Sequence, residues 1–79
     1  MNKKLYKAAL KKEFLDGFAK RLKKLREKRG LSRKALAAFS NVPAHIIRSF
    51  ENGRNSTAIP YVEFLADFFG LTVHELVKG

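Results

Sequence analysis

The sequence predicts an all-α fold: a compact bundle of five helices with an extra basic helical segment at the N-terminus. Apolar residues recur at spacings of three and four along the chain, and no stretch alternates apolar and polar residues as a strand would. Glycine, asparagine and proline interrupt this pattern where helices would end or begin. The chain has 79 residues, of which 46% are hydrophobic and seven are phenylalanine, so it can bury one small core.

Residues 3–14 form the first predicted helical segment. Five lysines lie between its apolar residues, which predicts an amphipathic helix with a basic face. Gly17 lowers helix stability by about 1 kcal/mol relative to alanine, and Asp16 can cap a new helix. We therefore expect a basic amphipathic helix or arm at residues 1–16 and the bundle at residues 17–79. The pattern leaves open whether one bent helix or two separate helices cross this boundary.

The next helix is predicted to run to about Arg29, with Phe18, Leu22 and Leu25 facing inward. Gly30 follows it and is suited to the left-handed conformation that ends many helices.

Residues 32–53 predict two short helices joined by a tight turn. Ser32 caps the first, which ends near Ser40, and Asn41 tolerates the positive φ of the turn. Pro43 opens the second helix because its φ is already helical, and Gly53 ends it.

The apolar spacing in this stretch separates an inner face from an outer face. The inner residues are Leu36, Ala37, Val42, Ile47 and Phe50. The outer residues near the start of the second helix are Ala44, His45, Arg48 and Ser49. A short turn between two helices, with the second free to enter a DNA major groove, is the geometry of a helix-turn-helix.

The last third of the chain predicts two more helices. After a polar loop at residues 54–58, Pro60 opens a helix that Gly70 ends. Thr72 and Glu75 form the capping box of a short final helix that carries Val73, Leu76 and Val77. The apolar side of the helix after Pro60 is expected to be Tyr61, Phe64, Leu65 and Phe68. From all helices together, the expected core includes Leu36, Ala37, Ile47, Phe50, Phe64 and Phe68.

The net charge of +10 is distributed unevenly. Residues 1–34 hold fourteen of the seventeen Lys and Arg residues but three of the seven Asp and Glu residues. This asymmetry favours a polyanionic partner that contacts mainly the N-terminal part of the chain.

The composition also argues against several classes of protein. The chain has no cysteine, so disulfides and thiolate metal sites are excluded. It has no apolar run long enough to span a membrane and no signal-peptide pattern, so we expect a cytoplasmic or nucleoid location. Two isolated histidines and scattered acids offer no catalytic group, metal site, cofactor site or small-molecule substrate site. We expect the protein not to be an enzyme.

Several motifs resemble the phage Cro/repressor (XRE-like) helix-turn-helix family of DNA-binding proteins, over a match from Phe18 to Val77. They are the stretch Arg21-Leu22-Lys23-Lys24-Leu25-Arg26, the tripeptide Gly30-Leu31-Ser32, the pair Leu36-Ala37 and the tripeptide Glu51-Asn52-Gly53. The resemblance implies a five-helix bundle that acts as a homodimer on a palindromic operator. It points to a transcription regulator, and to a repressor in particular.

The expected DNA contacts fall into two groups. Base reading is assigned to the outer face of the helix at about residues 43–52, through Ala44, His45, Arg48 and Ser49. Backbone contacts are assigned to Ser32, Arg33, Asn52, Arg54 and Asn55. The family usually has Gln where this chain has Arg33, so the guanidinium is expected to hold the phosphate instead. Arg26 and Glu51 match family positions that often form a buried ion pair, which is a structural role.

Other interpretations remain open at this stage. The bundle could instead be a protein-interaction module, such as an antitoxin or anti-repressor component, or a non-specific nucleoid-type DNA binder. The segment 1–16 could be an arm along DNA, a helix packed on the bundle, or a dimer contact. A lysine-rich amphipathic helix could also lie on an anionic membrane, although we expect no membrane partner.

Overall fold

The computed structural model describes residues 3–54 and 59–78, with side chains from Asp16 onward within those ranges. Its helices are α1 (Lys3–Lys28), α2 (Arg33–Ser40), α3 (Ala44–Glu51), α4 (Ile59–Phe69) and α5 (Val73–Lys78). No strand occurs in these two ranges, so the predicted all-α bundle is confirmed. None of the described helices is long and apolar enough to cross a lipid bilayer.

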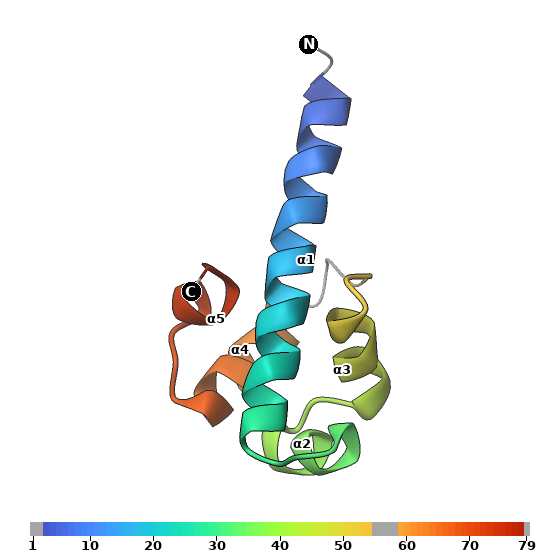
Figure 1. Ribbon diagram of the computed structural model, residues 1–79. Helices are drawn as coiled ribbons and strands as arrows, with labels where there is room; N and C mark the ends of the chain where they lie inside the picture. The colour runs from blue at the N-terminus through green and yellow to red at the C-terminus, as the bar shows by residue number, and fades with distance from the viewer. Residues whose placement is uncertain (1–2, 55–58, 79) are drawn as a thin grey trace.

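The four shorter helices surround the C-terminal half of α1, and the N-terminal half of α1 extends beyond them (Figure 1). The molecule is accordingly elongated, with extents of 43 × 22 × 20 Å. α1 contacts α3 and α5, while α2 contacts α3 and α4. The central helix is therefore the scaffold that holds α3 in place.

One continuous helix crosses the expected boundary at residue 16. α1 passes through Gly17 without a break, and Asp16 does not begin a new helix. Phe18, Ala19 and Leu22 are buried immediately after the glycine. Burial of this apolar face stabilises the helix by more than the glycine destabilises it, since packing supplies most helix stability in proteins.

The predicted helix ends follow a common geometry. At Gly30 (φ 67°), the N–H of Leu31 donates to the carbonyl of Arg26 at 3.1 Å. At Gly70 (φ 70°), the N–H of Leu71 donates to the carbonyl of Ala66 at 2.9 Å. This bond spans six residues and needs a left-handed residue just before its donor, which explains the glycines.

The core joins all five helices. Its centre is the pair of Phe18 and Phe50, whose ring centroids lie 5.1 Å apart. Around this pair, the buried cluster contains Leu22, Leu36, Val42, Ile47, Val62, Leu65, Ala66, Phe69 and Leu76.

The prediction for α4 was wrong in one respect. Phe64, expected in the core, is 45% exposed, and Phe68 is only half-buried. The buried face of α4 is instead made by Val62, Leu65, Ala66 and Phe69. The helix is apolar on two adjacent sides, so its spacing fits either face, and only packing against the other helices selects between them.

Candidate nucleic-acid interface

The turn between α2 and α3 is fixed by its own hydrogen bonds. Asn41 adopts φ 62°, and its N–H donates to the carbonyl of Ala37 at 3.1 Å. The buried hydroxyl of Ser40 donates to the carbonyl of Leu36 at 2.7 Å and accepts from the N–H of Val42 at 3.4 Å. Val42 is fully buried and anchors the turn in the core. Together these contacts hold α3 in one orientation relative to α2.

α3 begins without a side-chain cap. Pro43 occupies the capping position, and its carbonyl accepts from the N–H groups of Ile46 and Ile47 at 3.0 and 3.1 Å. The first N–H groups of α3 thus have no side-chain partner, and these groups at a helix start attract anions.

α3 is divided lengthwise into a buried side and an exposed side. Ile47 and Phe50 are buried. Ala44, His45 and Arg48 are exposed, as the sequence predicted, whereas Ser49 is half-buried.

The start of α2 completes this surface. Arg33 and Lys34 line a shallow hollow of about 270 Å³ with Ala44, His45 and Arg48 of α3. We call these five residues the reading face. Lys34 was absent from the sequence-based set because its position opposite α3 depends on how the two helices cross. Local spacing within α2 gives no signal of it.

Glu51 joins the reading face to the core. Arg26 donates to its carboxylate twice, from Nε to Oε2 at 2.7 Å and from Nη2 to Oε1 at 2.9 Å. Arg33 donates from Nε to the same Oε1 at 3.2 Å. The side chain of Glu51 is 1% exposed, that of Arg26 is 11% exposed and that of Arg33 is 38% exposed. One carboxylate therefore holds one buried and one partly exposed guanidinium.

Arg26 and Arg33 differ in how many of their hydrogen-bond donors remain free for a ligand. Arg26 also donates from Nη1 to the carbonyl of Leu31 at 2.8 Å. Hydrogen bonding to Glu51 raises the pKa of Arg26 above its ordinary value, so its charge is structural and permanent. The terminal nitrogens of Arg33 donate to no acceptor in the described part of the protein. Arg33 is therefore oriented by Glu51 and keeps donors for a ligand.

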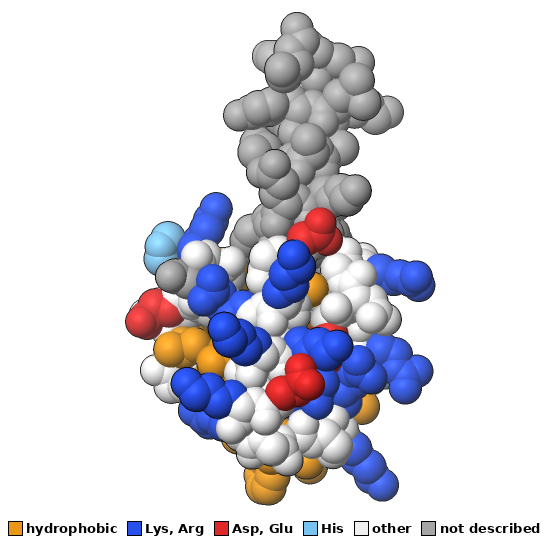
Figure 2. Space-filling model, viewed as in Figure 1, with side chains coloured by type: hydrophobic (Ala, Val, Ile, Leu, Met, Phe, Trp, Pro, Cys, Tyr) orange, Lys and Arg blue, Asp and Glu red, His pale blue; other side chains and the backbone are white. Residues whose placement is uncertain are grey.

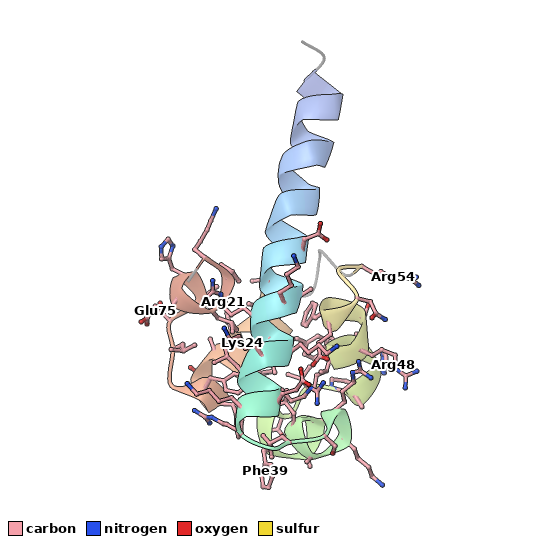
Figure 3. The ribbon with its side chains drawn as sticks, viewed as in Figure 1. Arg21, Lys24, Phe39, Arg48, Arg54 and Glu75 are labelled. Atoms are coloured by element: carbon pink, nitrogen blue, oxygen red, sulfur yellow. The ribbon has the colours of Figure 1, made fainter. Side chains whose placement is uncertain are left out.

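The remaining expected backbone contacts lie at helix ends. Ser32 is exposed and caps α2, its hydroxyl accepting from the N–H of Ala35 at 3.0 Å. Asn52 and Arg54 are exposed just after α3. Arg48 and Arg54 lie on the same side of the molecule (Figure 3). Asn55 lies outside the described residues.

The charge on this surface has one sign. In α2 and α3 the acidic residue is Glu51, whose side chain is buried and paired with cations. Arg33, Lys34, Arg48 and Arg54 therefore present positive charge without an exposed carboxylate from either helix. Such a surface suits a polyanion rather than an acidic small molecule that needs an enclosed pocket.

Comparison with known proteins agrees with this geometry. A family model described as a helix-turn-helix domain matches residues 18–77. The chain is also similar to the HTH-type transcriptional regulator DdrOP3 of Deinococcus deserti, with 34% identity over 59 residues. That match covers 75% of this chain and 46% of the relative, so the chain spans about half the length of the relative. No solved structure matches. On the strength of the family match and its place on α1 to α5, the chain belongs to the XRE-like helix-turn-helix family of DNA-binding domains.

Proposed function

We propose that the protein is a sequence-specific regulator of transcription that reads the major groove of double-stranded DNA with the helix at residues 43–52. The observation that carries this proposal is the reading face: a polar, positively charged surface on α3 and the start of α2, with no exposed carboxylate from either helix. The printed name of the relative, an HTH-type transcriptional regulator, supports the same role.

Base reading falls to the exposed side of α3. Arg48 can donate to guanine acceptors, and His45 can donate to or accept from a purine edge. Ala44 is small, so the start of the helix can approach the bases closely and meet a thymine methyl group. Ser49, half-buried, is the fourth member of this set and has the shortest reach.

Positioning on the duplex falls to the phosphate contacts. The start of α2 offers N–H groups near Ser32 together with Arg33, whose guanidinium is already oriented by Glu51. Asn52, Arg54 and Asn55 follow α3 and would meet the phosphates across the groove. These contacts set the register and the affinity but carry no sequence information.

We further propose that the protein acts as a homodimer on a palindromic operator and represses transcription by occupying it. Large apolar side chains are exposed on the last two helices, with Ile59 at 55%, Phe64 at 45% and Val73 at 37%. Exposed apolar side chains of this size are candidates for a contact surface between two copies of the chain. The segment 1–16 is proposed to be a basic extension of the DNA-binding domain rather than a separate folding unit.

The test is selection from a random double-stranded DNA pool at near-physiological salt, followed by sequencing. An enriched inverted repeat, with half-sites about one helical turn apart, is the expected result. The variant Arg48→Ala should relax the preference at one position of each half-site. Retention of DNA without an enriched motif would mean that the protein contacts only the DNA backbone. If no DNA were retained, the proposal would fail and a protein-interaction module would be the better interpretation.

A further inference from the structure

α1 carries a row of exposed lysines that are not part of the reading face. Lys20, Lys24 and Lys28 are exposed and spaced by four residues on one helix face. With a rise of 1.5 Å per residue, neighbours in the row are about 6 Å apart along the helix axis. We call these three residues the lysine row.

Among the described residues, Glu27 lies beside the lysine row and Asp16 is four residues before Lys20, but neither forms a salt bridge with it. No described carboxylate lies within 4.0 Å of an amino group of the row. A shallow hollow of about 570 Å³ is lined by the row together with Lys23 and Glu27, which places four cations beside one acid. Like charges four residues apart destabilise a helix, so this arrangement is unfavourable without an anion.

Arg21 adds another cation beside the lysine row. A second hollow of about 330 Å³ is lined by Gly17, Lys20, Arg21 and Lys24. The Nε atom of Arg21 is buried and has no hydrogen-bond partner among the described residues.

The lysine row lies on a different side of the molecule from the reading face. Arg48 and Arg54 point outward on the α3 side, whereas Arg21 and Lys24 lie across α1 from them, toward α5 (Figure 3). The space-filling view shows Lys and Arg side chains spread over α1 on the face turned to the viewer (Figure 2). The lysine row and the exposed side of α3 therefore face different directions.

We propose that the lysine row binds the phosphate backbone of a second DNA segment, so that the protein bridges two duplexes. This inference rests on the proposed function, since α3 holds the first duplex. Lysine is a compact charge on a flexible stem, which suits contact with the backbone without sequence preference. Protein interfaces usually have an apolar or aromatic centre, and the residues lining the two hollows include none. DNA is thus the better fit than an acidic protein.

The experiment immobilises a duplex carrying the selected site, adds the protein, and then adds a fluorescent duplex without the site. Wild-type protein is expected to capture the second duplex. The triple variant Lys20→Gln, Lys24→Gln, Lys28→Gln should lose capture by about ten-fold or more while its affinity for the first duplex stays within about two-fold. The matched variant with Arg at all three positions keeps the charge and should retain capture. Circular dichroism and thermal melting check that both variants are folded.

Each other result is decisive. Full capture by the Gln variant would overturn the proposal, since another surface, such as the reading face of a second subunit, would then bridge. A parallel loss of affinity for the first duplex would overturn it too, because the row would then contact that same duplex. If wild-type protein binds the first duplex but captures no second one, the proposal is overturned. Failure to bind the first duplex would instead refute the proposed function.

Discussion

Arg26 and Glu51 lie 25 residues apart in the sequence and are joined by two hydrogen bonds of 2.7 and 2.9 Å. Because Arg33 donates to the same carboxylate, one buried acid connects α1, the start of α2 and the end of α3. This side chain therefore adds a polar link between α3 and the core to the apolar contacts of Ile47 and Phe50.

Replacing that acid should destabilise the fold strongly. Glu51→Gln keeps the shape of the side chain but leaves the buried charge of Arg26 without a counter-charge, so the free energy of unfolding should fall by about 3–5 kcal/mol. Urea denaturation measures this change. Glu63→Gln is the matched control, because Glu63 is exposed and its replacement should change stability by less than about 0.5 kcal/mol. Equal effects of the two variants would contradict a structural role for the ion pair.

The two arginines of the reading face should have different effects on DNA binding. Arg33→Ala should weaken binding to all sequences alike and lower the salt-dependence slope by about 1, since it removes a phosphate contact. Arg48→Ala should instead reduce discrimination at one base position by about 1–3 kcal/mol. Binding titrations at several salt concentrations, on the selected site and on single-base variants, separate the two. If Arg33→Ala changed base discrimination and Arg48→Ala weakened binding to all sequences alike, the two assigned roles would be wrong.

The capping box of α5 should make a small contribution to stability that depends on pH. Glu75 accepts from the N–H of Thr72 at 3.0 Å, and this hydrogen bond lowers the pKa of Glu75 below its usual 4.5. A carboxyl whose pKa is lower in the folded state stabilises the protein above its unfolded pKa. That stabilisation is lost as pH falls through the folded pKa.

Glu75→Gln retains a hydrogen-bond acceptor but cannot titrate. The wild-type protein should therefore melt above this variant at pH 6, and the difference should shrink as pH falls below about 4.5. Thermal melting from pH 6 to pH 3 follows it. A constant difference over the whole range would show that the charge of Glu75 has no effect.

Gly17→Ala should stabilise the protein. A Cβ at this position would meet nothing within 4 Å, and the residue lies inside α1 with helical φ. The expected gain in the free energy of unfolding is about 1 kcal/mol, from the higher helix propensity of alanine. Gly30→Ala is the contrasting variant, because φ there is 67° and a side chain should destabilise the turn. Destabilisation by Gly17→Ala would show that α1 needs flexibility at this residue.

The proposed homodimer should depend on the exposed side of α4. Phe64→Ser removes a large apolar group that is 45% exposed, so it should weaken self-association with little effect on the monomer fold. Sedimentation at several protein concentrations measures the dissociation constant. Glu63→Ser is the control, since Glu63 is exposed on the same helix but carries no large apolar group. Equal effects of the two variants would contradict an apolar contact through Phe64.

Much of the fold is predictable because its signals are local. Ser32, Asn41 and Gly30 each determine the conformation of a few neighbouring residues, and they were sufficient to place the C-terminal end of α1 and both ends of α2. The exposed side of α3 was predictable for the same reason, since its spacing separates Ile47 and Phe50 from Arg48.

What could not be predicted depends on how distant elements pack. α4 is apolar on two sides, so the sequence alone could not show that Val62 and Phe69 are buried while Phe64 is exposed. Lys34 enters the reading face only because α2 and α3 cross with the start of α2 beside the exposed side of α3. The link from Glu51 to Arg33 likewise requires two helix ends to meet in space.

The lengthwise division of α3 also bears on how such a domain can diversify. Ile47, Phe50 and Glu51 bind the helix to the rest of the molecule, whereas Ala44, His45 and Arg48 face solvent. Substitutions on the solvent side leave the core untouched, so the residues proposed to read bases can change without a loss of stability. Ile47, Phe50 and Glu51 are thus constrained by packing, whereas Ala44, His45 and Arg48 are free to vary.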